Sequence, residues 1–325
     1  MRVLPALLLV SAAAQAQFRS TVPLVVAPIT VTDAKGHYID GLTEADLLLS
    51  DNNVPQRIRL DYDAYPISLV VAVETGDKSE PVINKLGGSG ILFANLVAAY
   101  GGETALLTFA DEVKVRHDFT GDPDAIAGPL RNLHVEGSGA CMLDAIKQAM
   151  TMLAARPKER RRILFLIAEN RDRSSTTKID EAIRAVQREN ATVYWLTYSA
   201  ALMPYTMKPK TVHSIHREED GKVIENDVQP TEWDIMGAIH ELVHLNAPNV
   251  ADLFSRVTGA HAMNFLKKSG LEDEIHRLGE EIHRQYIASF QPPPGEPGAF
   301  HTIRITVKRH PEWKAKTREG YWAVE

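Results

Sequence analysis

The sequence has a single cysteine, no excess of basic residues and no long apolar run. Each of these absences excludes a class of protein. Its only cysteine is Cys141, so internal disulfides cannot stabilise the fold and an apolar core must do so. Its 36 Lys and Arg side chains are outnumbered by 42 Asp and Glu, a formal net charge of −6, which gives no electrostatic case for nucleic-acid binding. No segment approaches the roughly 18 consecutive apolar residues of a membrane-spanning helix. What remains is a globular chain of 325 residues, long enough for one large or two ordinary domains.

The N-terminal residues 1–16 have the pattern of a signal peptide. Arg2 forms a minimal charged region, residues 4–13 form a short apolar core, and residues 14–16 read Ala-Gln-Ala, a small-x-small cleavage site. No cysteine follows the apolar core, so we do not expect a lipid-anchored form. The pattern predicts an exported protein, either periplasmic or secreted.

Two continuous apolar runs of strand length each end in a glutamate. The first run leads to Glu74 and the second to Glu169. Such runs are typical of parallel strands that helices cover on both faces. Strand and helix patterns alternate over residues 66–285, which predicts a doubly wound, mostly parallel α/β sheet. In such a sheet ligands bind beyond the carboxyl ends of the strands, where both glutamates are expected.

The segments on either side of this alternation are β-like. Residues 17–65 contain apolar-polar alternation from Leu24 onward, and residues 286–325 contain strand patterns at 286–290, 300–308 and 314–321. Neither segment has enough strands to be stable alone. We therefore expect the two to pair into one small β-sandwich, with the α/β domain inserted between them.

Short motifs recur in a specific order over nearly the whole chain that follows residue 16. They include Val31-Thr-Asp33, Gly41-Leu-Thr43, Pro55-Gln56, Phe119-Thr120, Leu143-Asp-Ala145, Thr258-Gly259, Gln285-Tyr286 and Arg318-Glu-Gly-Tyr321. In this order they resemble a family of exported bacterial proteins related to von Willebrand factor A and abundant in acidobacteria. The resemblance implies a von Willebrand factor A-like α/β fold and a non-enzymatic role in binding other proteins. It brings no catalytic residue.

The metal site of that family is altered in this sequence. In the family the first strand ends in Asp-x-Ser-x-Ser, a later loop supplies Thr and the fourth strand supplies Asp, all around one divalent cation. The matching positions here are Glu74, Gly76, Lys78, Ala140 and Glu169. Three of these five side chains offer no oxygen, whereas Mg²⁺ requires near-octahedral oxygen ligands at about 2.1 Å. We predict a degenerate site without a divalent cation as cofactor.

Two hypotheses describe the charge at this degenerate site. In one, the ammonium group of Lys78 replaces the cation and bridges Glu74 and Glu169; in the other, Lys78 points into water and the glutamates are solvated. Without any cation the two carboxylates would repel each other, and one would have to protonate.

The predicted binding surface is the rim around these glutamates, and its expected ligand is a protein or a cell-envelope component. The rim residues are Glu74, Thr75, Asp77, Lys78, Gly139, Ala140, Glu169 and Asp172. A polar insertion at residues 200–231 follows a predicted strand and so belongs to the same rim. Both a recognition loop and a disordered surface loop are consistent with its composition.

A second motif suggests a different function. His240-Glu241-Leu-Val-His244 matches the zinc-peptidase pattern, in which two histidines on one helix face bind Zn²⁺ and the glutamate acts as general base. No Gly-x-x-His follows, so the third zinc ligand of such peptidases is missing. The alternative function is therefore a zinc metallopeptidase with zinc on His240 and His244.

Two further features have mainly structural interpretations. Cys141 begins a predicted helix, whose dipole is expected to lower the pKa of the thiol, although a small, partly buried residue would also suit this position. The basic run from Lys158 to Arg162 precedes a buried strand and is expected to form a surface edge.

Overall fold

The structure is a computed structural model, and the residues that it describes fall into several ranges. These are 24–61, 66–87, 93, 101–198, 250–260, 262–264, 270–293 and 298–323. The predicted signal peptide, the 200–231 insertion and the motif from His240 to His244 lie outside them. Within these ranges we find no helix that combines the length and the apolar character needed to cross a membrane.

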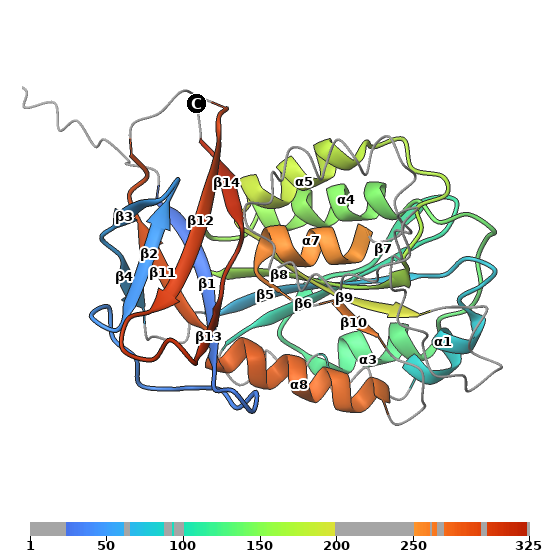
Figure 1. Ribbon diagram of the computed structural model, residues 1–325. Coiled ribbons are helices and arrows are strands. Elements are labelled where there is room, and N and C mark those ends of the chain that lie inside the picture. The colour runs from blue at the N-terminus through green and yellow to red at the C-terminus, as the bar shows by residue number, and fades with distance from the viewer. Residues whose placement is uncertain are drawn as a thin grey trace, which may run out of the picture.

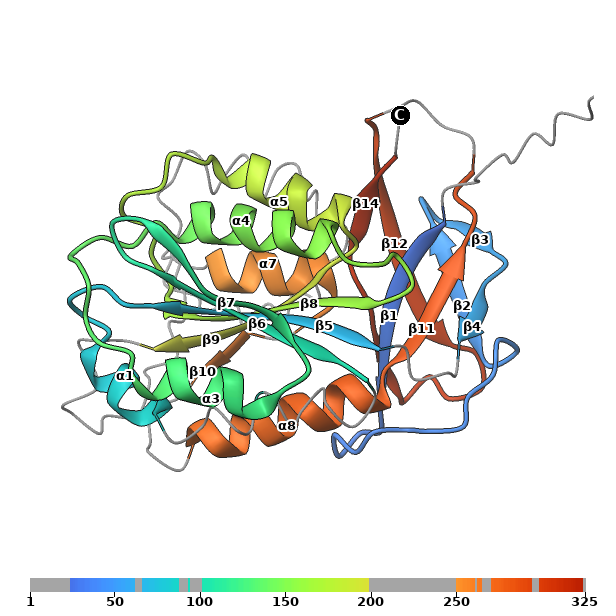
Figure 2. The same ribbon diagram turned by 180° about the vertical axis from the view of Figure 1, so that it is seen from behind.

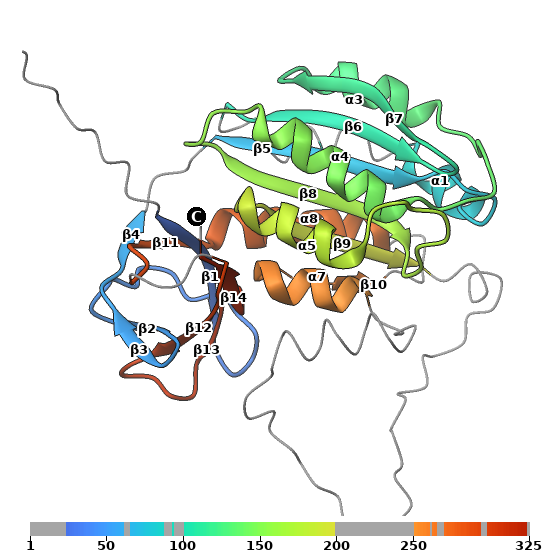
Figure 3. The ribbon, with the colours of Figure 1, turned by 90° about the horizontal axis from the view of Figure 1, so that it is seen from above.

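The centre of the larger part is a six-stranded sheet with the order β10-β9-β8-β5-β6-β7 (Figure 3). Its strands are β5 (Ile67–Glu74), β6 (Glu103–Phe109), β7 (Val113–Thr120), β8 (Arg161–Glu169), β9 (Thr192–Tyr198) and β10 (Ala262–Asn264). All neighbours run parallel except β6 and β7. Every residue of β5 is buried, as expected of a central parallel strand.

Helices cover both faces of this sheet (Figure 1). One face carries α4 (Met142–Ala154), α5 (Ile179–Arg188) and α7 (Val250–Thr258), and the other carries α1 (Glu80–Leu86), α3 (Pro123–Arg131) and α8 (Gly270–Arg284). Because side chains alternate along a strand, Val70 and Ala72 of β5 pack in the first apolar core while Val71 and Val73 pack in the second. The predicted doubly wound α/β fold is confirmed.

The flanking segments form two four-stranded sheets. One has the order β13-β1-β11-β4 and the other β14-β12-β2-β3. Their strands are β1 (Val25–Thr32), β2 (Leu47–Asp51), β3 (Val54–Gln56), β4 (Arg59–Asp61), β11 (Tyr286–Phe290), β12 (Phe300–Val307), β13 (Lys314–Lys316) and β14 (Gly320–Trp322). N- and C-terminal strands pair directly, β1 with β11 and β2 with β12, around a third apolar core that includes Ile29, Leu49 and Phe290. The predicted β-sandwich made from both flanking segments is thereby confirmed.

The prediction of one strand over residues 314–321 is wrong, because this segment forms two short strands that belong to different sheets. The chain leaves one sheet at the end of β13 and enters the other at β14, with Arg318 between them. Arg318 is only 3% exposed, and its guanidinium donates hydrogen bonds to the carbonyl of Val26 at 3.2 Å and to Oδ1 of Asn190 at 2.9 Å. A buried side chain with these partners turns the chain from one sheet into the other.

The sandwich packs at the amino ends of the parallel strands (Figures 1 and 2). Arg256 of α7 forms an ion pair with Glu319 at 2.9 Å, and the guanidinium of Arg184 on α5 lies over the ring of Trp322 at 5.1 Å. Both glutamate-ended strands therefore point away from the sandwich, and their carboxyl ends form the free rim of the α/β part.

Candidate functional site

The two glutamates meet at the rim because β5 and β8 are neighbours in the sheet. Val73 is paired with Ile167 in the parallel register, so the ends of the two strands lie side by side. Oε2 of Glu74 accepts a hydrogen bond from the backbone N–H of Glu169 at 2.8 Å. Glu74 is thus the inner carboxylate of the pair, with a fully buried side chain, while the side chain of Glu169 is 16% exposed.

Arg173 provides the positive charge between these carboxylates. Its Nη2 lies 2.9 Å from Oε1 of Glu74, and its Nη1 lies 3.2 Å from Oε2 of Glu169. Nη2 is also 3.9 Å from Oδ1 of Asp77, the outermost acid of the group. One planar guanidinium therefore bridges two carboxylates from adjacent strands, a geometry that its fork of N–H donors favours.

The hypothesis that Lys78 replaces the cation is wrong. Lys78 is exposed, and its ammonium group forms no ion pair with the described part of the chain. Arg173 takes this role because the loop after β8 folds back over the site, where the backbone N–H of Arg173 donates to the carbonyl of Ala140 at 3.0 Å. The sequence did hold a signal, an arginine four residues after Glu169 in a loop that leaves the rim.

Burial controls the protonation of Glu74. Desolvation raises the pKa of its carboxyl to about 7, against the opposing effects of the Glu169 N–H, Arg173 and the hydroxyl of Tyr198. Burial and the nearby Glu74 carboxylate also raise the pKa of Tyr198, which is 3% exposed. Near neutral pH the inner carboxylate is thus divided between its charged and neutral forms.

The residues at the rim do not fit the divalent cation that is bound at this position in the family that the sequence resembles. A Cβ atom at Gly76 would lie 2.5 Å from the carbonyl oxygen of Gly139 and 3.3 Å from Nη2 of Arg173, so a serine ligand has no room here. Ala140 is fully buried and has no hydroxyl group. The guanidinium of Arg173 occupies the space between the carboxylates that a cation would need.

Aspartates hold the neighbouring loops in place. Oδ1 of Asp111, in the turn after β6, accepts the N–H of Gly139 at 2.8 Å. Oδ1 of Asp172 accepts the N–H groups of Met142 at 2.9 Å and Leu143 at 3.2 Å, at the start of α4. A carboxylate at this position satisfies free helix N–H groups and is stabilised by the helix dipole.

A second aspartate ties the same helix to the loop after β8. Asp144, in the first turn of α4, accepts the N–H groups of Thr176 at 3.0 Å and Thr177 at 2.8 Å. Three loops of the rim are thus joined through side chain to backbone hydrogen bonds. These hydrogen bonds tie together the loops around Arg173.

The predicted rim residues lie at different depths. Glu74, Thr75 and Ala140 are buried, and the hydroxyl of Thr75 donates to the carbonyl of Phe109 at 3.3 Å. Three others are half-buried: Gly139, Glu169 and Asp172. Asp77 and Lys78 are exposed. Of the predicted rim residues, only these two are exposed to solvent. Arg173 and Asp111, which organise the rim, were absent from the prediction.

The expected lowering of the Cys141 pKa is wrong. Cys141 does precede α4, but it is 2% exposed, and burial raises the pKa of its thiol to about 11. The charges of Asp144 and Asp172 act in the same direction. Desolvation therefore outweighs the helix dipole, and the thiol is a core side chain.

Comparison with known protein families matches one segment of the chain. Residues 91–171 match the family described as von Willebrand factor type A domain. No protein of curated function matches the sequence.

Solved structures with low sequence identity are also similar to this chain. The conserved hypothetical protein BatB from Bacteroides thetaiotaomicron is 15% identical, with a TM-score of 0.41 over 66% of this chain and 99% of that one. The von Willebrand factor type A structure from Catenulispora acidiphila is 9% identical, with a TM-score of 0.47 over 95% of this chain and 76% of that one. The vWF domain of the type V pili tip protein Mfa5 from Porphyromonas gingivalis is 10% identical, with a TM-score of 0.45 over 68% and 96%.

Proposed function

Because this chain contains a von Willebrand factor type A domain, we propose that it is an exported, non-enzymatic protein-interaction module whose rim binds without a bridging cation. Domains of this family commonly act in protein–protein interaction or adhesion. The expected ligand is a protein or a cell-envelope component, met in the periplasm or outside the cell.

The observation that supports this proposal is the position of Arg173. Its guanidinium lies 2.9 Å from Glu74 and 3.2 Å from Glu169, so the charge that a cation would contribute is already part of the chain. A divalent cation would have to displace this ion pair and would then find no side-chain oxygen at Gly76 or Ala140. The free energy of such an exchange is unfavourable, since Mg²⁺ tolerates few missing or misplaced ligands.

Partner contacts would come from the exposed edge of the same rim. Asp77, 3.9 Å from Arg173, and the next residue, Lys78, are exposed, while half-buried Gly139 and Asp172 lie in loops fixed by hydrogen bonds. Fixed loops lose little conformational entropy on binding, which favours affinity.

The test exchanges the charges of two neighbouring rim residues. Its effect on partner capture is compared with that of the same kind of exchange at a distant site. The double variant Asp77→Lys/Lys78→Glu should abolish capture of cell-envelope proteins by the immobilised mature chain. Lys158→Glu/Glu159→Lys is a matched control, since this exposed pair lies just before β8 at the opposite end of the sheet. Capture by the unmodified protein should be the same with and without a chelator. Loss of the captured protein on chelation would contradict the metal-independent mode.

The competing function is a zinc metallopeptidase that uses His240, Glu241 and His244. Only the sequence motif favours it, because these residues lie outside the described ranges. Zinc analysis of the purified mature protein distinguishes the two. One equivalent of Zn²⁺ that is lost in His244→Ala, together with peptidase activity lost in Glu241→Gln, would replace the interaction module with the enzyme.

A further inference from the structure

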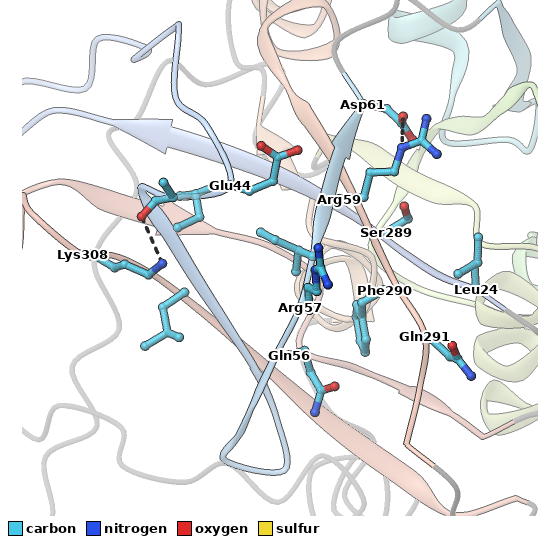
Figure 4. Close-up of a pocket in the computed structure, with 14 residues that line it drawn as sticks. Leu24, Glu44, Gln56, Arg57, Arg59, Asp61, Ser289, Phe290, Gln291 and Lys308 are labelled. Carbon is cyan, nitrogen blue, oxygen red and sulfur yellow. Dashed lines mark hydrogen bonds and ion pairs between the residues drawn. The ribbon is translucent and has the colours of Figure 1, made fainter.

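A groove opens on the β-sandwich (Figure 4), the part of the molecule that lies at the opposite end of the α/β sheet from the rim (Figure 1). Its volume is about 1070 Å³. Residues of both sheets and of the link between β3 and β4 line it, among them Leu48 of β2, Arg57 and Ile58 of the link, and Phe290 of β11. It is therefore separate from the surface assigned to the proposed function.

Part of the groove surface is apolar and exposed. Phe290 and Ile58 are nearly buried, at 2% and 9% exposure, and belong to the core of the sandwich. Leu48 and Leu24 also line the groove but are 40% and 57% exposed. Large apolar side chains exposed along a concave surface favour contact with another molecule.

The charges in the groove are unbalanced. Both of its acids are already engaged: Oε1 of Glu44 accepts the N–H of Leu60 at 3.0 Å, and Oδ1 of Asp61 lies 3.4 Å from Nε of Arg59. Arg57 is exposed, and no described residue forms an ion pair with it. Figure 4 shows Arg57 among the other labelled residues of the groove.

A third cation adds to this excess. Nζ of Lys308 donates to the carbonyl oxygen of Ala45 at 3.0 Å, which leaves its charge without an acidic partner in the groove. The residues that line the groove thus include two acidic side chains, Glu44 and Asp61. They also include three basic side chains, Arg57, Arg59 and Lys308. This excess of positive charge is complementary to an acidic partner.

The sheet edges beside the groove are closed to strand addition. β3 and β4 are edge strands, but Pro55 of β3 has no N–H, and the outward N–H of Leu60 on β4 is taken by Glu44. Proline and engaged edge groups prevent pairing with another chain. An occupant must then be recognised by its side chains and not by backbone hydrogen bonds.

We propose that this groove binds an extended acidic segment of a partner protein. A carboxylate of that segment pairs with Arg57, and a large apolar side chain next to it packs against Leu48, which lies across from Arg57 at the end of the β2–β3 pair. The sandwich would then hold one partner while the rim of the α/β part remains free.

The probe is a library of random 12-residue peptides, selected on the immobilised mature chain. Enriched peptides should place Asp or Glu next to Leu, Ile or Phe. Their affinity, measured by fluorescence polarisation, should fall about tenfold or more for Arg57→Glu. Arg304→Glu is the matched control, because Arg304 is an exposed sandwich arginine on β12 that does not line the groove. This control should change the affinity by less than about twofold.

A second variant separates the apolar contact from the charge. Leu48→Asp should also weaken the peptides, whereas Asp77→Lys/Lys78→Glu at the rim should leave them unchanged. Because Leu48 and Arg57 are exposed, both groove variants should keep the melting temperature of the unmodified protein. Peptides that bind Arg57→Glu as well as the unmodified protein, or no enrichment at all, would overturn the proposal. So would a dimer of this chain that Leu48→Asp dissociates in sedimentation, because a second copy would then fill the groove.

Discussion

Gly76 and Arg173 share one space at the rim. A Cβ atom on Gly76 would lie 3.3 Å from Nη2 of Arg173, the nitrogen that pairs with Glu74. Gly76 has no side chain, and the guanidinium of Arg173 fills the space that a side chain at position 76 would need. The ion pairs of the rim are therefore formed entirely by the chain's own residues.

Gly76→Ser should destabilise the protein by about 2 kcal/mol, because the new side chain overpacks the site. The cost should fall by about 0.5 to 1 kcal/mol when Arg173→Ala is already present, since one of the two close contacts is then gone. A double-mutant cycle in urea measures this coupling. Equal costs in both backgrounds would mean that only the carbonyl of Gly139 opposes a side chain at position 76.

Arg173→Ala should cost about 3 kcal/mol of unfolding free energy at pH 8, because it leaves the buried carboxylate of Glu74 next to Glu169 without a counter-charge. The cost should be smaller at pH 5.5, where Glu74 is neutral. Arg171→Ala is the control, as Arg171 is exposed and has no ion pair with the described residues. Urea unfolding at the two pH values measures both. A cost that does not vary with pH would contradict the assignment of Arg173 as the counter-charge.

Glu74 should make the protein less stable as the pH rises. Its pKa is raised from 4.5 to about 7 in the folded state, so between these values the folded protein binds more protons than the unfolded chain, and stability falls with increasing pH. Glu74→Gln removes this titration, so its stability relative to the unmodified protein should increase by up to about 3 kcal/mol between pH 4.5 and 8. Urea unfolding across this range measures the difference, and a constant difference would show that the buried carboxyl does not titrate there.

Millimolar Mg²⁺ or Mn²⁺ should leave the melting temperature of the mature protein unchanged, because Arg173 fills the position between the two glutamates. A ligand that binds only the folded state raises the melting temperature by mass action, so thermal unfolding is a direct assay. A shift that disappears in Glu74→Ala would show that the rim still binds a cation despite the arginine.

The fold could be predicted because its signals are local. The apolar runs before Glu74 and Glu169 are continuous, and both strands are central in the sheet. The position of Arg173 could not be predicted in the same way, because it depends on the path of a loop, fixed by the hydrogen bond to Ala140. Periodicity reports which face of an element is buried, but it does not report which loop folds over which strand end.

The partners of charged side chains near the starts of strands could not be predicted from the sequence pattern either. The run from Lys158 to Arg162 was predicted to be a surface edge. Lys158 is exposed, but Arg161 donates to the carbonyl of Ile282 at 2.6 Å, and Arg162 pairs with Glu189 at 2.6 Å. Long side chains with guanidinium ends reach acceptors on helices distant in sequence, and composition alone cannot identify them.

Arg318 joins the sandwich to the α/β part, because its guanidinium contacts Val26 in one and Asn190 in the other. Burial lowers its pKa to about 10, and its guanidinium donates to the carbonyls of Val26 and Gly320 and to Oδ1 of Asn190. Lysine keeps the charge but cannot reproduce three donors in one plane, so at least one acceptor loses its bond. Arg318→Lys should therefore cost about 2 kcal/mol in urea unfolding, while Arg309→Lys, at an exposed position of the sandwich, should cost almost nothing. A lysine variant as stable as the unmodified protein would mean that these hydrogen bonds contribute no net stability to the junction.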